Sequence, residues 1–250
     1  MSTLVADAHI HIVEDDRRFG ADLVFTWQDL HTMFVEKRIE RANVVPMLNN
    51  ADDSRVVNKQ FLEKLSRQEH KNRMWAFYWP HPHEVDDDIA GRADVAGIKY
   101  HPSISQVQID HAPDVVRIAR NKGLPLLVHC GRHAISGFEY VLNAYRAQPD
   151  VKFIAAHMGG MANELILQAL SLISGMSSRE NLYLDTSGCM NPKILRRGIE
   201  VMGEDRVLYG TDLPFFDTEV SNFVLSRVGL GQKALRKVYH DNIMKLHSKR

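Results

Sequence analysis

Two histidines near the start of the chain are spaced so that they could share a metal ion. Asp7, His9 and His11 interrupt an apolar run from Leu4 to Val13 that is typical of a buried β-strand. Side chains of an extended chain alternate between faces, so His9 and His11 point the same way, with their Cα atoms about 6 to 7 Å apart. Neutral imidazole binds divalent transition metals, and Asp7 could add a ligand or orient a ring. Two solvated histidines at a strand end are the alternative, so the pair needs partners elsewhere.

Apolar runs and helical stripes alternate along the chain and would position such partners. The predicted strands are 4–13, 41–47, 74–79, 95–101, 124–129, 152–157, 181–185 and 207–212. The predicted helices are 26–39, 54–69, 86–92, 113–122, 137–148, 163–173, one beginning at Pro192, 217–228 and 232–247. Residues 86–92 are the weakest of these helices. Eight such units predict an α/β fold, a (β/α)8 TIM barrel forming a single domain over residues 1–250, with a doubly wound open sheet as its rival.

The composition argues against several classes of function. The 31 Lys and Arg residues balance 31 Asp and Glu residues, so no net charge favours nucleic acid as a partner. No apolar run approaches the roughly 18 residues of a membrane span, and the N-terminus lacks the pattern of a secretory signal. We therefore expect neither nucleic acid nor membrane as a partner, and a cytoplasmic location. Cys130 and Cys189 are too far apart in sequence to suggest a disulfide framework or a thiolate metal site, and we expect both to be small pocket residues rather than nucleophiles.

Further candidate ligands fall at the ends of predicted strands. The carboxyl ends of the strands of a TIM barrel share one rim, where active sites are built. His129 ends the fifth predicted strand, His157 the sixth and Asp212 the eighth. His9, His11, His129 and Asp212 would surround one cation with nitrogen and oxygen ligands and leave a position open for water. His157 is a candidate metal ligand, acid–base group or oxyanion stabiliser, and Asp212 a candidate to take a proton from water while contacting the metal.

Other rim residues are candidates for contact with a substrate. Lys99 and His101 end the fourth predicted strand, and Arg132 and His133 follow His129. A guanidinium fork there could meet an anionic group of the substrate, with solvation as the alternative.

Several further polar residues have a structural or surface interpretation. His81 and His83 lie in a proline-rich turn, either lining the pocket or exposed. We expect Asp185 to accept hydrogen bonds from the rim backbone rather than to transfer protons. The remaining histidines are predicted to be surface residues: His31, His70, His111, His240 and His247.

Together the motifs resemble the amidohydrolase superfamily. They are Asp7-x-His9-x-His11, Gly97-Ile-Lys-Tyr-His-Pro102, Leu127-Val-His129-Cys-Gly131, Ala156-His157-Met-Gly-Gly160, Asp185-Thr-Ser-Gly188 and Tyr209-Gly-Thr-Asp212-Leu-Pro214. The chain is most similar to the amidohydrolase-2 branch, which includes aminocarboxymuconate-semialdehyde and resorcylate decarboxylases and several lactonases. The resemblance covers nearly the whole chain.

The resemblance also implies roles for individual residues. It puts His9, His11, His129 and Asp212 at metal-ligand positions, and His157 at the position of a catalytic histidine that contacts a metal in other members. Lys99 lies near the place where some members carry a carboxylated lysine between two metals. We favour one metal over two.

We therefore expect a metal-dependent hydrolase that attacks a small-molecule C–O or C–N bond of a lactone, ester or amide through metal-activated water. A metal-dependent decarboxylase of a small aromatic or unsaturated carboxylic acid is the first alternative, and a catalytically inactive metal- or ligand-binding barrel is the second. Zn²⁺ is the expected ion, with Mn²⁺, Fe²⁺ and Ni²⁺ also open. The expected partner is a small, anionic substrate, and a homo-oligomer is compatible with the sequence. No dinucleotide site is expected, because Gly229-Leu-Gly-Gln-Lys-Ala234 lacks the β-α-β context of that fingerprint.

Overall fold

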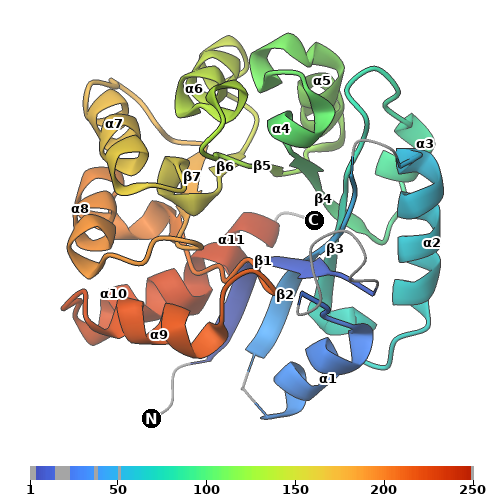
Figure 1. The fold of residues 1–250 in the computed structure, drawn as a ribbon, viewed down its shortest axis with the longest axis horizontal. Helices are drawn as coiled ribbons and strands as arrows, with labels where there is room; N and C mark the ends of the chain where they lie inside the picture. The colour runs from blue at the N-terminus through green and yellow to red at the C-terminus, as the bar shows by residue number, and fades with distance from the viewer. Residues whose placement is uncertain (1–3, 15–22, 37–38, 50–51, 249–250) are drawn as a thin grey trace.

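Eight parallel strands pair in chain order to form one sheet, which closes on itself (Figure 1). The computed structural model describes residues 4–14, 23–36, 39–49 and 52–248. The strands are β1 (Val5–Ile12), β2 (Ile39–Pro46), β3 (Met74–Tyr78), β4 (Val95–Tyr100), β5 (Leu126–Val128), β6 (Phe153–Ala155), β7 (Leu182–Asp185) and β8 (Val207–Leu208). Backbone hydrogen bonds from Ala8 N to Tyr209 O, at 2.8 Å, and from Asp212 N to His9 O, at 2.7 Å, join β1 to the chain after β8. The predicted TIM barrel is confirmed.

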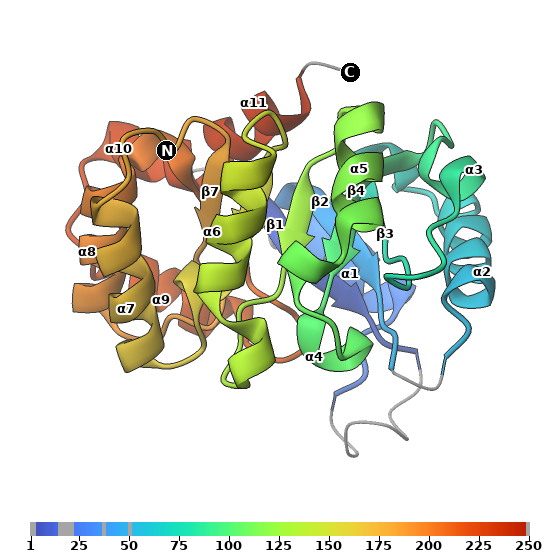
Figure 2. The same cartoon turned by 90° about the horizontal axis from the view of Figure 1, so that it is seen from above.

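Helices form the outer layer around the barrel (Figure 2). They are α1 (Trp27–Glu36), α2 (Ser54–Ser66), α3 (Asp87–Ala90), α4 (Pro102–Ser105), α5 (Pro113–Lys122), α6 (Phe138–Ala147), α7 (Asn163–Ser174), α8 (Pro192–Met202), α9 (Thr218–Ser226), α10 (Gln232–Arg236) and α11 (Asn242–His247), with a π-helical turn at Lys237–Asp241 before α11. None of the helices in the described ranges is long and apolar enough to cross a membrane.

Several sequence-based boundaries differ from the structure, and the eighth strand, predicted over 207–212, ends at Leu208. The first helix was predicted to run to residue 39, but α1 ends at Glu36 and Ile39 begins β2. Residues 37 and 38 of that prediction lie outside the described residues. The third helical segment is a short turn, α3, capped by Asp86, whose carboxylate accepts the backbone N–H groups of Asp88 and Ile89.

Alternation along the strands divides the apolar residues between two cores. Side chains such as Phe77, Leu127 and Ile154 belong to one cluster and fill the inside of the barrel. Their neighbours in sequence, such as Tyr78 and Val128, belong to a second cluster between the strands and the helices. The same parity turns polar side chains at the strand ends towards the barrel axis.

The C-terminal helix covers the amino ends of the strands, on the side of the barrel opposite α4 (Figure 2). His247 on α11 was predicted to be a surface residue, and this prediction is wrong because the side chain is only 7% exposed. Its Nε2 lies 2.9 Å from Asn43 Oδ1 on β2, and its ring stacks on Trp75 with 4.1 Å between centroids. His247 therefore joins α11 to the floor of the barrel.

A substitution at Gly97 on β4 tests how tightly the inside of the barrel is packed. A Cβ added there would lie 2.3 Å from Phe77 Cζ, closer than any ordinary contact. We expect Gly97→Ala to lower the free energy of unfolding by about 1 to 3 kcal/mol, because a filled core must shift to accept it. Gly231→Ala is the control, since its Cβ would have nothing within 4 Å and its φ of −68° suits alanine. Urea unfolding followed by circular dichroism measures both, and equal midpoints for the two variants would contradict the packing argument.

Candidate metal centre

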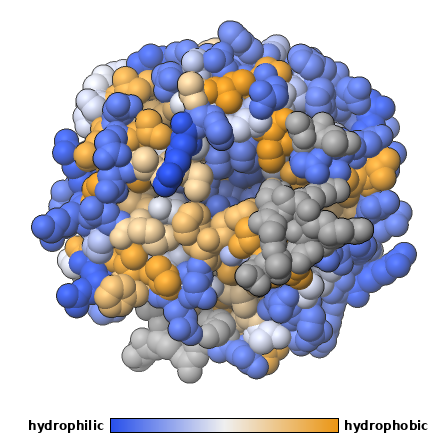
Figure 3. Space-filling model, in the orientation of Figure 1, coloured by the Kyte–Doolittle hydropathy of each residue, from blue (hydrophilic) through white to orange (hydrophobic). Residues whose placement is uncertain are grey.

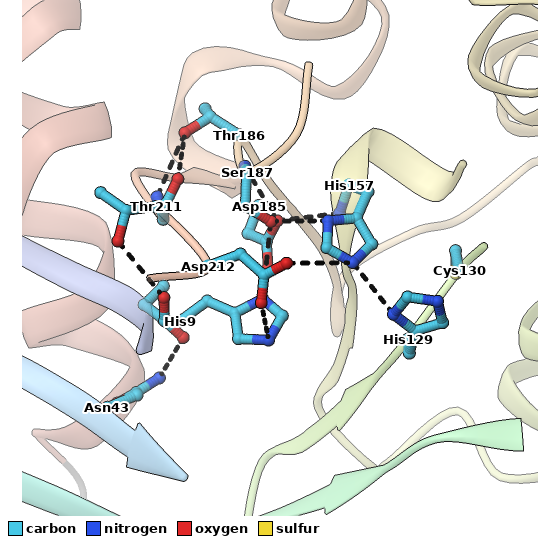
Figure 4. A network of polar contacts seen from close by, with 12 residues as sticks. His9, Asn43, His129, Cys130, His157, Asp185, Thr186, Ser187, Thr211 and Asp212 are labelled. Atoms are coloured by element: carbon cyan, nitrogen blue, oxygen red, sulfur yellow. Dashed lines mark hydrogen bonds and ion pairs between the residues drawn. The ribbon is translucent and has the colours of Figure 1, made fainter. Parts of the chain in front are cut away.

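Three electron-rich atoms converge at the carboxyl end of the barrel. His9 Nε2 lies 3.2 Å from His11 Nε2, as expected for two histidines on one face of β1. Asp212 Oδ1, which follows β8, lies 3.2 Å from His9 Nε2 and 3.4 Å from His11 Nε2. All three side chains are buried. The structure thus brings together residues separated by some two hundred positions in sequence (Figure 4).

The protonation of His9 indicates what this arrangement can hold. His9 Nδ1 donates a hydrogen bond to Asp185 Oδ2 at 3.0 Å, so the ring proton is on Nδ1 and Nε2 presents a lone pair. Burial, and next the charge of Lys99, hold the pKa of His9 and His11 well below the usual value, so both rings are neutral. Two neutral imidazole nitrogens and a carboxylate oxygen at these separations fit a divalent cation.

Lys99 enters this cluster from the end of β4. Its Nζ lies 2.8 Å from His9 Nε2, and the side chain is fully buried. Burial lowers the pKa of Lys99 to about 8, against the opposing charges of Asp212 and Asp185. Lys99 therefore carries its proton at neutral pH and places a positive charge beside the donor atoms. The sequence-based suggestion that it contacts substrate is compatible with this position.

Asp212 is set up to exchange a proton. Burial raises the pKa of its carboxyl group to about 7, although His157 and Lys99 act in the opposite direction. A bound cation would lower that pKa again. Without the ion both protonation states are accessible near neutral pH, as a proton carrier requires, and a bound cation favours the ionised state. The backbone of Asp212 has a φ of 61°, a left-handed conformation that aspartate tolerates better than most residues.

His157 is held in place by Asp185 through Ser187. Asp185 Oδ1 accepts the backbone N–H groups of His157, at 2.9 Å, and of Ser187, at 3.1 Å, which confirms the predicted role of Asp185 in binding the rim backbone. The Ser187 hydroxyl also donates to Asp185, so its oxygen accepts the Nδ1–H of His157 at 2.9 Å. His157 Nε2 is left facing the centre, 4.0 Å from Asp212 Oδ2. One carboxylate therefore sets the tautomers of both His9 and His157.

A stack of flat rings continues from the donors towards the rim. His129 Nδ1 lies 3.0 Å from His157 Nε2, so His129 is joined to the centre through His157, and its role as a metal ligand stays a prediction. The ring of His101 stacks on His129 with 3.8 Å between centroids and an angle of 12°. Trp79 stacks on the other side of His101 at 5.8 Å and 8°. His101 and His129 are both half-buried.

Asp7 supports the site from below. Its Oδ1 accepts the backbone N–H of His9, at 2.9 Å, and of Thr211, at 3.1 Å, while Oδ2 accepts the Thr211 hydroxyl at 2.7 Å. Both carboxylate oxygens are therefore used in joining β1 to the segment after β8. Asp7 fixes the backbone that carries the donors, whereas the sequence suggested that it would add a ligand or orient a histidine ring.

The predicted loop residues lie further from the donors. Arg132 and His133 are exposed and line a cavity of about 130 Å³ bordered by α6 and α7. His81 lines another, of about 180 Å³, which shares Trp79 with the ring stack. His83 is exposed.

The two cysteines are buried and unactivated. Cys130 and Cys189 both belong to the apolar core between strands and helices, where the sequence suggested pocket residues, and burial raises the pKa of the Cys130 thiol. Burial also raises the pKa of Cys189, to about 11. Neither thiol is ionised at neutral pH, as a nucleophile would need to be.

Sequence reasoning missed two contributors to this site. Ser187 stands two residues after Asp185, and its hydroxyl becomes informative only when the loop folds back onto His157. Trp79 ends the third predicted strand. Its position next to the rim was the signal in the sequence that it could belong to the site.

Asp185→Asn tests whether this carboxylate orients the donors. An amide in its place can no longer hold the proton on His9 Nδ1 as a carboxylate does, so we expect divalent-metal affinity to fall by about 10- to 100-fold. Isothermal titration of metal into the chelator-treated protein measures this affinity. Asp150→Asn removes an exposed carboxylate and should leave affinity unchanged. Equal affinities for the two variants would show that Asp185 has no such role.

Comparison with known proteins identifies structures with a similar fold and the family to which the chain belongs. No curated protein matches the sequence. The fold is similar to a 5-carboxyvanillate decarboxylase from Novosphingobium aromaticivorans complexed with manganese and 4-hydroxy-3-methoxy-5-nitrobenzoic acid, with a TM-score of 0.76, 12% identity and 98% and 96% of the two chains covered. It is also similar to a dihydroxybenzoic acid decarboxylase from a Polaromonas species with bound manganese and 2-nitroresorcinol, with a TM-score of 0.74, 17% identity and 100% and 98% covered.

A third similar structure is a candidate 2-pyrone-4,6-dicarboxylic acid hydrolase from Acinetobacter baumannii with citric acid bound. Its TM-score is 0.73, with 12% identity and 98% and 99% of the chains covered. At these identities the likeness shows the fold alone. The sequence itself, however, matches the amidohydrolase family Amidohydro_2 over residues 6–247. The chain therefore belongs to the amidohydrolase family, in the branch that the motifs at its strand ends resemble.

Proposed function

We propose that this protein is a metal-dependent decarboxylase of a small, planar carboxylic acid, either aromatic or unsaturated. The observation that carries the proposal is the stack of Trp79, His101 and His129 beside a buried ammonium and a set of metal donors. Flat rings favour a flat substrate, and the cationic centre favours its carboxylate. Figure 3 looks onto this end of the barrel, where the middle of the face is hollowed and hydrophilic.

The donors and Lys99 would bind the acid group of the substrate. His9, His11 and Asp212 would hold a divalent ion, with His129 as a further ligand. Such an ion, when bound, supplies a Lewis acid that draws electron density from substrate oxygens. Because the ion would take the lone pair of His9 Nε2, the Lys99 ammonium would leave that atom and serve as a charge-assisted donor for a carboxylate or a neighbouring oxygen.

Asp212 would supply the proton that decarboxylation needs. When the bond between the carboxylate carbon and the ring or chain carbon breaks, its electron pair stays on that ring or chain carbon, which must gain a proton as CO₂ leaves. Burial raises the pKa of the Asp212 carboxyl group to about 7 and so opposes the lowering that a bound cation would cause, which suits this group to give that proton and regain it from water. His157 Nε2, 4.0 Å away, is placed to assist this exchange.

Two of the similar structures support this choice of reaction over hydrolysis. Both are named as decarboxylases of substituted benzoic acids and both contain manganese. We infer a divalent ion here, with Mn²⁺ as the first to test beside the Zn²⁺ expected from sequence, because the donor set accepts either.

Hydrolysis of a C–O or C–N bond is the second candidate. The similar structure of the candidate pyrone-dicarboxylate hydrolase favours it, as does Asp212, which could accept a proton from water instead of giving one to carbon. The two reactions differ in their products, so product analysis separates them.

Product analysis in isotopic water tests the proposal. Manganese-loaded protein would be incubated in D₂O with hydroxybenzoic acids, and in H₂¹⁸O with aromatic lactones. We expect release of CO₂ and deuterium at the carbon that carried the carboxylate. Incorporation of ¹⁸O into an opened lactone without CO₂ release would favour the hydrolase and reject the decarboxylase.

Asp212→Asn should separate proton transfer from folding. We expect kcat to fall by at least about 100-fold, because the amide neither carries the proton nor binds the ion as a carboxylate does. Asp150→Asn should keep wild-type kcat, and circular dichroism should show both variants folded. Full activity in folded Asp212→Asn would remove this residue from the mechanism.

The pH dependence of kcat/KM tests Lys99. Its protonated form, present below a pKa of about 8, is the one that attracts a carboxylate, so kcat/KM should fall as pH rises through about 8, by about tenfold per unit. A bound cation would move this limb to lower pH, not higher. Lys99→Met should remove the part of this fall that Lys99 causes, leave the part that follows loss of the Asp212 proton, and raise KM. An unchanged profile in folded Lys99→Met would mean that Lys99 does not bind the acid.

A further inference from the structure

A second group of metal-type donors lies in the outer helical layer, away from the mouth of the barrel. His31 is in the middle of α1, while Glu69 and His70 lie in the turn that follows α2. These three residues take no part in the hydrogen bonds that close the barrel or in the reaction proposed above.

The side chains of this group face one another closely. The rings of His31 and His70 are stacked, with 4.6 Å between centroids and an angle of 11°. Glu69 Oε2 lies 4.0 Å from His31 Nδ1, and one ligand atom from each of the three residues lies within 4.8 Å of the others. Phe34, one turn along α1, meets the His70 ring edge-on at 5.9 Å and holds it in this orientation.

The contacts within the protein leave part of this group unsatisfied. A separation of 4.0 Å between His31 and Glu69 is too long for a hydrogen bond. His70 Nε2 is inaccessible to solvent and has no hydrogen-bond partner among the described residues. A buried nitrogen without a partner is costly, and binding a cation through it would satisfy it.

We propose that His31, Glu69 and His70 form a second divalent-metal site, of the class that takes Zn²⁺ or Cu²⁺. Two imidazole nitrogens and a carboxylate oxygen are the ligand types that these ions prefer. Ligand bonds of about 2.0 to 2.2 Å require the donor atoms to approach by about 1 Å, and rotation of the Glu69 side chain, which is 77% exposed, allows this. Water would fill the remaining coordination positions from the side of Glu69 and His31, whose side chains are 77% and 35% exposed.

Such a site would tie α1 to the turn that leads into β3. A ligand that binds only the folded chain stabilises it by mass action, so the ion should raise the melting temperature. This effect does not depend on the reaction at the barrel mouth, and it can be measured without a substrate.

Zinc binding to the intact chain tests the proposal. Equilibrium dialysis against buffered free Zn²⁺, followed by elemental analysis, counts the bound ions. We expect His31→Ala and His70→Ala to bind about one ion fewer per chain than the wild type. His111→Ala, which removes an exposed histidine elsewhere, should bind as many ions as the wild type. Wild-type counts in folded His31→Ala and His70→Ala would overturn the proposal, as would an equal loss in His111→Ala, which would indicate nonspecific binding to surface histidines.

A His11→Ala background separates the two sites. In that variant the donor set at the mouth is broken, so any rise in melting temperature with Zn²⁺ should come from the surface site. We expect the rise to persist in His11→Ala and to disappear in the double variant His11→Ala/His31→Ala. If Zn²⁺ raises the melting temperature of His11→Ala and of the double variant equally, the ion does not bind at His31. This conclusion holds whether or not a metal binds at the mouth of the barrel.

Discussion

The crowding of electron-rich atoms at the barrel mouth is the constraint on which the site depends. His9 Nε2, His11 Nε2 and Asp212 Oδ1 lie within 3.4 Å of one another, away from water. Lone pairs held this close repel unless a proton or a positive charge lies between them. The atoms cannot simply move apart, because the backbone of β1 is hydrogen-bonded to the segment that carries Asp212. The closed barrel therefore maintains an arrangement that a shared proton or a nearby cation stabilises, and the Lys99 ammonium lies 2.8 Å from His9 Nε2.

Sequence patterns could predict this convergence because it follows from two periodicities. The two-residue period of a strand puts His9 and His11 on one face, and the repeat of strand and helix puts His157 and Asp212 at equivalent strand ends. Neither argument needs side-chain coordinates. For the same reason the two periodicities predicted only that Lys99 lies at the rim. They did not show that its ammonium group reaches His9 Nε2.

What sequence could not predict depends on how loops turn. The positive φ of His157, 59°, and of Gly188, 67°, brings Ser187 back against His157, and no spacing rule anticipates that contact. The stack of Trp79 on His101 likewise depends on the path of two loops. His247 shows the same limit at the other end of the barrel. A histidine in a polar helix is expected at the surface, and only the structure shows that Asn43 gives this one a buried hydrogen-bond partner.

Lys99 is also the residue that distinguishes the two candidate reactions on physical grounds. The pKa of Asp212 does not separate the two reactions, because burial raises it to about 7 against the charges of His157 and Lys99, and the carboxyl group can then act as an acid or as a base. The charge of Lys99 does separate them, because only a decarboxylase needs a buried cation that holds a substrate carboxylate. The ammonium beside His9 is therefore better suited to a carboxylate substrate than to an attacking water.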